Sequence, residues 1–180
     1  MFHARLRADL ELRLLEERHA PIHFALVDQD RHYLREWLGW VDATETEEDS
    51  LTFIRVTRER FASKGEITAG VWFQDRFAGV ISTQMTDLVN RKAEVGYWLG
   101  KSFQGQGIMT EACRALVRHA LGEMDLNRVE IRCATGNTRS SAIPARLGFT
   151  HEATLREAQL LHGKYHDLEV WSMLRKELRD

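Results

Sequence analysis

The sequence contains few cysteines, and they lack the spacing that cysteine-based sites require. Cys113 and Cys133 are the two cysteines of the 180-residue chain, and they form no CxxC pair. A disulfide-stapled domain or a zinc site needs more cysteines at close and regular spacing. We therefore expect two small core residues, no disulfide framework and no bound metal.

Long apolar runs are also missing. No segment approaches the roughly 20 consecutive apolar residues that span a bilayer. Arg5 and Arg7 lie where a signal peptide would need an apolar stretch. These absences predict a cytoplasmic protein that does not enter a membrane.

Neither sign of charge dominates the chain. The 25 basic and 27 acidic residues are spread along it, for a formal net charge of −2. Because no basic block is present, we expect no nucleic-acid partner. No repeat, low-complexity stretch or flexible linker divides the sequence. A chain that is 43% hydrophobic can bury one sizeable core, which predicts a single domain over residues 1–180.

Helix and strand signals are clear in the first third of the chain. Residues 10–15 alternate leucine with charge and predict a strand, and Pro21 opens a helix with apolar spacing. Thr44 and Glu47 have the spacing of a capping box. They predict a second helix that begins there and ends near Gly65.

The rest of the chain alternates strands with helices. Asp75 and Arg76 lie between two β-branched and aromatic runs, which indicates a hairpin over 67–85. Apolar periodicity predicts the other elements, which are strands at 93–99, 128–135, 149–156 and 168–174 and helices at 112–120 and 137–148. The sequence is therefore typical of a mixed α/β domain.

The segment Gln104–Met109, with the letters QGQGIM, lies between a predicted strand and a predicted helix. Its glycines allow the backbone to curve around an anion, and the helix dipole adds positive potential. The segment lacks the Gly-Lys-Ser/Thr of a nucleotide triphosphatase loop and the Rossmann glycine spacing. A diphosphate site and a plain tight turn both fit this pattern.

Four segments, taken in order and spacing, resemble the GNAT acetyltransferase superfamily. They are Glu94–Leu99, Gln104–Ala112, Asn137-x-x-Ser140 and Arg146–Phe149. Two further segments resemble the RimJ/RimL-type branch, which acetylates the N-terminal serine or alanine of ribosomal proteins. These are Trp37–Trp40 and Gly163–Asp167, so the resemblance extends over nearly the whole chain.

The resemblance implies an α/β (α+β) GNAT fold with about four helices. Its seven-stranded mixed, mostly antiparallel sheet is splayed between strands 4 and 5, where the pantetheine of acetyl-CoA lies. The implied acetyl-CoA residues are Tyr97, Trp98, Leu99, Gln104, Gly105, Gln106, Gly107, Ile108, Met109, Thr110, Asn137 and Arg146. Met109 departs from the glycine or alanine that ends the family loop pattern.

Acetyl transfer needs a proton donor for the departing thiolate and a base for the attacking amine. The resemblance assigns the donor to Ser140, although Asn137 with Ser140 is also typical of simple helix capping. RimL-type enzymes place a glutamate base where this chain has Gln159. Glu157 shares a strand face with Gln159 by alternation. We therefore prefer Glu94 as the base, with an exposed strand-end carboxylate as the alternative.

The acceptor contacts are assigned to Trp37, Trp40, Gln159 and Tyr165. The two tryptophans form either an aromatic wall for the amine or part of the core. A pKa of ~8 leaves roughly a tenth of an α-amine neutral at pH 7, whereas a lysine pKa of ~10.4 leaves under about one in a thousand. A chain without a strong base therefore favours a protein N-terminus as acceptor.

Other functions remain open from the sequence. The acceptor can instead be a small-molecule amine such as an aminoglycoside or a polyamine. The loss of the expected glutamate at Gln159 also fits a CoA-binding domain without catalysis. His162 and His166 flank Gly163 in a turn and do not form a metal pair. The branch resemblance further implies a possible homodimer.

Overall fold

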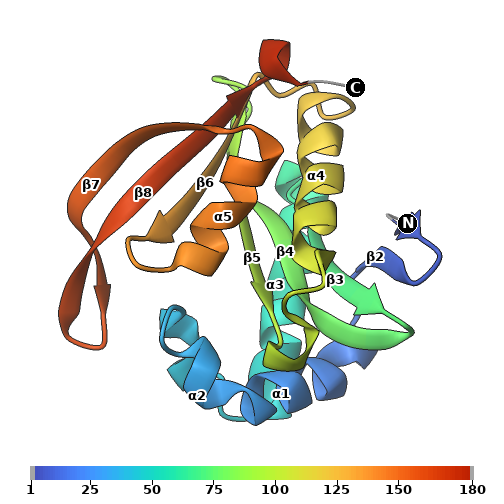
Figure 1. The fold of residues 1–180 in the computed structure, drawn as a ribbon. Helices are drawn as coiled ribbons and strands as arrows, with labels where there is room; N and C mark the ends of the chain where they lie inside the picture. The colour runs from blue at the N-terminus through green and yellow to red at the C-terminus, as the bar shows by residue number, and fades with distance from the viewer. Residues whose placement is uncertain (1–2, 179–180) are drawn as a thin grey trace. The chain divides into compact units, whose positions relative to one another are not determined.

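The computed structural model describes residues 3–178 (Figure 1). It divides into two compact units, which are described in turn. Unit 1 comprises the residues up to Ser82 together with Tyr97–Ala112, and unit 2 comprises Thr83–Gly96 and the residues from Cys113 onward. Three elements contribute residues to both units, namely β4 (Arg76–Asp87), β5 (Lys92–Leu99) and α4 (Ile108–Leu121).

The other strands are β1 (His3–Arg7), β2 (Leu10–Leu14), β3 (Thr68–Phe73), β6 (Arg128–Ala134), β7 (Thr150–Leu161) and β8 (Lys164–Leu174). The eight strands are hydrogen-bonded in the order β1-β2-β3-β4-β5-β6-β8-β7. The β5–β6 ladder is parallel, and the β1–β2, β2–β3, β3–β4, β6–β8 and β7–β8 ladders are antiparallel. The predicted mixed, mostly antiparallel sheet is therefore confirmed. Its strand count is eight instead of seven because β1 was not predicted.

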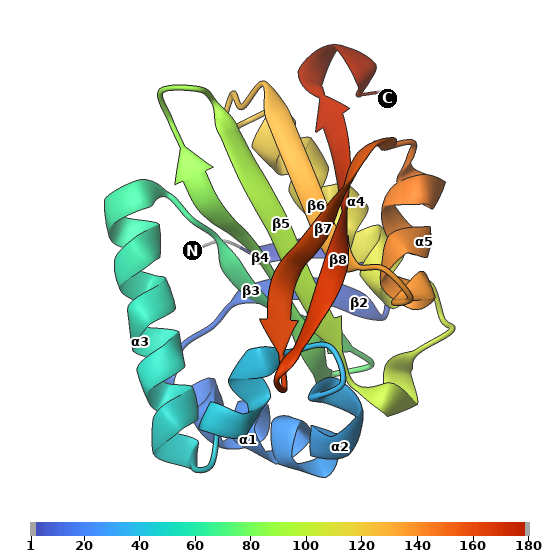
Figure 2. The ribbon, with the colours of Figure 1, turned by 90° about the vertical axis from the view of Figure 1, so that its left-hand side faces the viewer.

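Unit 1 packs helices against its strands. Helices α1 (Ala20–Gln29) and α3 (Glu47–Lys64) contact each other, and α3 also contacts β3 (Figure 2). Leu12 of β2 and Ile54 of α3 are both 0% exposed, as expected for alternating and helical apolar spacing that faces one core. The short helix α2 (Arg31–Leu34) follows α1.

Helix α3 begins two residues later than the sequence predicted. The capping box joins Thr46 to Asp49, with the Thr46 side chain accepting from the Asp49 amide and the Asp49 side chain accepting from the Thr46 amide. The predicted box from Thr44 is therefore wrong. The predicted end is confirmed, because Gly65 caps the helix at a φ of 69°.

The parallel ladder between β5 and β6 in unit 2 is short. It pairs Lys92–Glu94 with Arg128–Glu130. By contrast, β6 pairs with β8 along its whole length, from Arg128 to Ala134. Strand β5 therefore parts from β6 beyond Glu94. These are the fourth and fifth strands of the predicted set, so the predicted splay is confirmed.

Strands β7 and β8 form a long antiparallel hairpin beside β6, coloured orange to red in Figure 1. The hairpin turns at His162 and Gly163, whose φ values are 49° and 76°. Its ladder is irregular between Leu155 and Gln159, where Glu157 has a φ of 50°. Helix α5 (Thr138–Leu147) contacts β6, β7 and β8. Within residues 3–178, no helix is long and apolar enough to cross a membrane.

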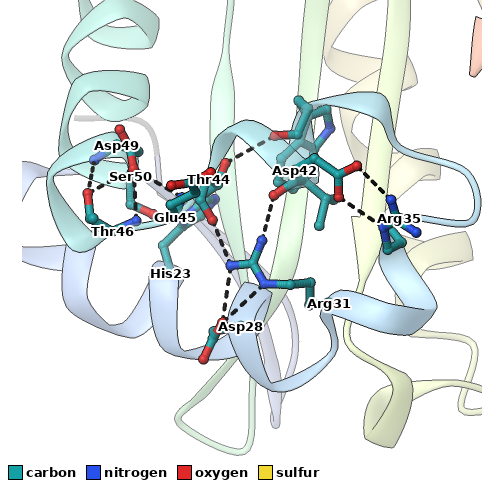
Figure 3. Close-up of polar contacts among 12 residues, drawn as sticks. His23, Asp28, Arg31, Arg35, Asp42, Thr44, Glu45, Thr46, Asp49 and Ser50 are labelled. Carbon is teal, nitrogen blue, oxygen red and sulfur yellow. Dashed lines mark hydrogen bonds and ion pairs between the residues drawn. The ribbon is translucent and has the colours of Figure 1, made fainter. Parts of the chain in front are cut away.

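A buried histidine is an unusual feature of unit 1. His23 of α1 is 2% exposed, and its Nδ1 lies 2.9 Å from the Ser50 Oγ (Figure 3). Its ring stacks on Phe53 and meets the edge of Trp98 at centroid distances of 5.2 and 5.6 Å. Its Nε2 has no hydrogen-bond partner among the described residues. Burial lowers the pKa of His23 to about 4, so the ring is neutral at pH 7.

His23 should therefore make the fold sensitive to mild acid. Its pKa is depressed on folding, so its contribution is intact above the unfolded pKa of ~6.5 and declines as the pH falls toward the folded pKa. Between pH 7 and pH 5 we expect the free energy of unfolding to fall by about 2 kcal/mol from this group alone. Urea unfolding of the parent at both pH values measures the fall.

The comparison variant combines His23→Leu with Ser50→Ala. The second change removes the buried Ser50 hydroxyl, which would otherwise lose its His23 partner. This double variant should lose most of the pH dependence, whereas His32→Gln, at an exposed histidine, should keep it. An equal pH dependence in the parent and the double variant would show that His23 is not the sensitive group.

Candidate active site

The loop after β5 is tied to the helices of unit 1. The amide of Gly100 donates to the Ala78 carbonyl at 2.8 Å. The amide of Lys101 donates to Oδ2 of the buried Asp30 at 2.6 Å. The Gln104 side chain is hydrogen-bonded to the Tyr33 hydroxyl. These contacts fix the start of the glycine loop, and the sequence alone did not reveal Asp30 or Tyr33.

The glycines of the loop adopt left-handed backbone conformations. Gly105 and Gly107 have φ values of 74° and 72°, both are exposed, and a Cβ added at either would meet no atom within 4 Å. Helix α4 begins directly afterwards at Ile108, so its first amides have no acceptor within the helix. The loop thus presents amides and a positive helix end, which is the arrangement that binds anions.

Met109 does not obstruct this loop. Its side chain is 5% exposed and that of Ile108 is 1% exposed, so both enter the core. The departure from glycine or alanine at Met109 therefore adds apolar packing and still leaves the backbone amide. Thr110 follows in the first turn of α4 and is half-buried.

The end of β5 is packed tightly against β4. A Cβ added at Gly79 would lie 2.2 Å from the Trp98 carbonyl oxygen, so only glycine allows this approach. Trp98 is 8% exposed, while Tyr97 and Leu99 are half-buried. The predicted pantetheine strand is therefore rigidly placed within unit 1.

The two predicted acceptor tryptophans lie outside the fully buried core. Trp40 belongs to the 3₁₀ helix η2 (Gly39–Ala43) and is 38% exposed. Its ring centroid lies 5.9 Å from that of Trp98. Trp37 precedes η2 and is half-buried. An aromatic surface formed by Trp40 over Trp98 thus exists in unit 1.

Ser140 lies in the first turn of α5 in unit 2. The Asn137 side chain accepts a hydrogen bond from the Ser140 amide at 3.3 Å, so Asn137 is the N-cap of the helix. The predicted capping is confirmed. The Ser140 side chain is hydrogen-bonded to the Cys133 thiol.

Cys133 links Ser140 to a carboxylate. The Cys133 thiol donates to Glu169 Oε2 at 3.9 Å, and the Trp171 indole donates to the same oxygen at 2.9 Å. Burial is the main cause that raises the pKa of Cys133 to about 11, so the thiol is neutral at pH 7. The sequence did not predict this cluster, because Cys133 and Glu169 come together only through β6–β8 pairing.

Glu94 is not a free surface carboxylate. Its side chain is 17% exposed, accepts from Gln84 Nε2 at 3.1 Å and lies 3.6 Å from Arg132 Nε. Desolvation raises the pKa of Glu94, and it outweighs the hydrogen bond from Gln84 and the charge of Arg132, which lower it. A raised pKa is the direction that suits a carboxylate base near neutral pH.

The remaining predicted residues lie on the β7–β8 hairpin and on α5. Gln159 is half-buried opposite His166, and Tyr165 is 58% exposed. The expected alternation between Glu157 and Gln159 does not hold, because the ladder irregularity separates them and the Glu157 amide bonds to an Asp167 carboxylate oxygen at 2.8 Å. Arg146 is exposed near the end of α5.

The predicted site residues therefore form two groups, one in each unit. Unit 1 holds Trp37, Trp40, Tyr97 to Leu99 and Gln104 to Thr110, and unit 2 holds Glu94, Asn137, Ser140, Arg146, Gln159 and Tyr165. Within residues 3–178, no three His, Cys, Asp or Glu side chains are grouped so that they could hold a metal ion.

Known proteins match nearly the full length of the chain. The family described as "Acetyltransferase (GNAT) domain" matches residues 9–150. The Bacillus subtilis (strain 168) protein named "Putative ribosomal N-acetyltransferase YdaF" is 38% identical over 178 residues, 98% of this chain and 97% of that protein. The ribosomal-protein-serine acetyltransferase of Escherichia coli (strain K12) is 30% identical over 168 residues, 92% of each chain.

A solved structure shows the same fold. The RimL ribosomal L7/L12 alpha-N-protein acetyltransferase in complex with coenzyme A has a TM-score of 0.93 and 30% identity to this chain. The match covers 96% of this chain and 98% of that one. In that structure, coenzyme A is held in a disulfide with one of the protein's cysteines.

Proposed function

Because the chain belongs to the GNAT acetyltransferase family and is an N-acetyltransferase, we propose that it transfers acetyl from acetyl-CoA to a protein N-terminus. The preferred acceptors are N-terminal serine and alanine, and ribosomal proteins are the proposed partners. The observation that carries the use of acetyl-CoA is the open Gly105 and Gly107 loop at the start of α4.

In this proposal, the amides of the segment Gln104–Thr110 bind the CoA diphosphate. Several amides and a helix N-terminus can share the charge of a diphosphate without a lysine in the loop. The backbone of Tyr97, Trp98 and Leu99 pairs with the pantetheine arm, and Arg146 contacts the nucleotide end. Coenzyme A bound to the RimL relative supports this assignment.

Ser140 is the proposed proton donor to the CoA sulfur. The acceptor nitrogen forms a bond to the thioester carbon, the carbon–sulfur bond breaks, and Ser140 delivers a proton to the departing sulfur. The neutral Cys133 thiol beside Ser140 places no negative charge next to the developing thiolate. The disulfide of the RimL relative shows that in that protein a cysteine can reach the CoA sulfur.

Glu94 is the proposed acceptor of the amine proton. Its raised pKa supports this role, and Gln159 cannot perform it because an amide does not accept a proton at neutral pH. An α-amine with a pKa of ~8 is more often neutral at pH 7 than a lysine with a pKa of ~10.4, so its proton is removed more easily. This difference supports an N-terminal α-amine as the acceptor.

The direct test is an acceptor panel. The purified protein is incubated with acetyl-CoA and either serine- or alanine-starting peptides, an N-terminally blocked lysine peptide, spermidine or an aminoglycoside, and thiol release is followed. We expect the serine- and alanine-starting peptides to react fastest. Faster release with spermidine or the aminoglycoside would overturn the protein acceptor, and no release with any of them would overturn the proposed function.

Ser140→Ala tests the proton donor. We expect kcat to fall by about 100-fold, because general acid catalysis typically contributes at least that factor. The KM for acetyl-CoA should change little. Ser141→Ala is the matched control, since the Ser141 hydroxyl bonds only weakly to the Thr138 carbonyl at 3.5 Å. A Ser140→Ala variant at full rate would remove the assignment.

Gly107→Ala tests the diphosphate loop. An alanine at this left-handed position is strained by about 1–2 kcal/mol and should shift the loop amides. We expect the Kd for coenzyme A, measured by calorimetry, to rise at least about tenfold, since 1.4 kcal/mol is a factor of ten. Gly65→Ala is the control, because Gly65 has a similar φ of 69° and equally open surroundings at the end of α3. Equal Kd values for both variants would contradict the loop assignment.

A further inference from the structure

The segment between α2 and α3 carries Trp40 and is hydrogen-bonded to the Arg31 guanidinium. Arg31, the first residue of α2, extends its guanidinium under η2 (Figure 3). Its Nη1 donates to the Val41 carbonyl and its Nη2 to the Thr44 carbonyl, both at 2.7 Å. Arg31 therefore joins two carbonyls that lie on the C-terminal side of Trp40.

The same guanidinium is itself fixed by a carboxylate. The Nε and Nη2 of Arg31 donate to Asp28 Oδ1 at 3.1 Å each. Asp28 belongs to α1, so the contact anchors the guanidinium to the helix that also carries His23. The Arg31 side chain is 29% exposed, and its contacts with neutral carbonyls are shorter than its contacts with the carboxylate.

The two carbonyls lie at the C-terminal end of η2. The Val41 carbonyl also accepts from the Thr44 amide at 3.2 Å, so Arg31 adds a second donor there, and Thr44 is the residue that follows the helix. The planar guanidinium can serve two carbonyls and one carboxylate together, whereas a lysine ammonium cannot reproduce that fork. The local turn is closed further by the Thr44 hydroxyl, which donates to the Trp40 carbonyl at 3.3 Å.

A second ion pair in this segment is also exposed to solvent. Arg35 donates to both Asp42 carboxylate oxygens at 2.9 and 2.8 Å (Figure 3). Both side chains are nearly half exposed, at 44% and 46%, and exposed pairs contribute little. Asp28 is itself 59% exposed, so the contacts that distinguish Arg31 are those to the Val41 and Thr44 carbonyls. The segment that they restrain carries Trp40, whose ring centroid lies 5.9 Å from that of Trp98.

We propose that Arg31 is a positioning residue for the acceptor, which fixes Trp40 through the Val41 and Thr44 carbonyls and thereby sets the affinity for the incoming N-terminus. The inference rests on the proposed function and adopts the first of the two alternatives from the sequence, in which Trp40 forms an aromatic wall for the acceptor amine. Arg31 touches neither substrate. Loss of the Arg31 side chain should leave the affinity for acetyl-CoA and the rate of the chemical step unchanged and should lower the affinity for the acceptor peptide.

A double-mutant cycle between Arg31 and Trp40 tests this coupling. Initial rates with acetyl-CoA and a serine-starting peptide give the two KM values and kcat for the parent, Arg31→Met, Trp40→Ala and the double variant. We expect each single variant to raise the peptide KM about tenfold, with the acetyl-CoA KM unchanged and kcat within about threefold. The double variant should show no further rise, because residues that act through one another are not additive.

Two further variants complete the experiment. Arg31→Lys keeps the charge and most of the side chain and should still lose most of the peptide affinity. It also serves in place of Arg31→Met if that variant does not fold. Arg55→Met removes an exposed arginine of α3 that pairs with Glu17, and it should keep the parent constants. Thermal unfolding confirms that each variant is folded.

Separate outcomes identify which idea fails. An inactive parent protein would overturn the proposed function. An active parent overturns the inference if the two single effects multiply to about 100-fold in the double variant, if Arg31→Lys keeps full peptide affinity, or if the acetyl-CoA KM rises as much as the peptide KM.

Discussion

Strand β4 passes so close to β5 at Gly79 that no side chain fits between them, and the aromatic part of unit 1 depends on this contact. It fixes the Trp98 carbonyl and ring at the end of β5. The ring then supports Trp40 on one side and the buried His23 on another. The chain leaves β5 through Gly100 and enters the glycine loop already restrained by Asp30. Placement of the loop thus follows from strand packing at Gly79 together with the contacts of Lys101 and Gln104 to Asp30 and Tyr33.

In unit 2, strand pairing positions the residues around Ser140. The short β5–β6 ladder lets the two strands part after Glu94, while β6 continues along β8. That second ladder brings Cys133 opposite Glu169, and the Asn137 cap then starts α5 with Ser140 in its first turn. The pairing of β6 with β8 therefore sets the surroundings of Ser140. Cys133 and Glu169 are far apart in the sequence, so local sequence patterns could not predict that they meet.

Apolar periodicity and helix-capping residues predicted most of the helices and strands. The prediction failed where two similar capping patterns lay close together. An acidic residue follows both Thr44 and Thr46 three positions later. The structure uses Thr46 as the cap, while the Thr44 hydroxyl donates to the Trp40 carbonyl. Strand β1 was missed because three of its five residues are polar or charged and none is buried, so pairing with β2 and not burial defines it. The turn at Gly105 and Gly107 and the helix cap at Asn137 were predictable from motifs. Arg31 was not, because its partners are backbone carbonyls, which any residue type supplies.

In the proposed mechanism, Glu94 takes the role of the glutamate expected at Gln159. Burial of the carboxylate penalises its charged form, whereas Gln84 and Arg132 stabilise that form, and the balance leaves the pKa raised. A carboxylate whose pKa is raised holds an abstracted proton more readily. Such a base suits an acceptor that already loses its proton near pH 8. The substitution at Gln159 is thus compatible with transfer to α-amines and least compatible with transfer to lysine.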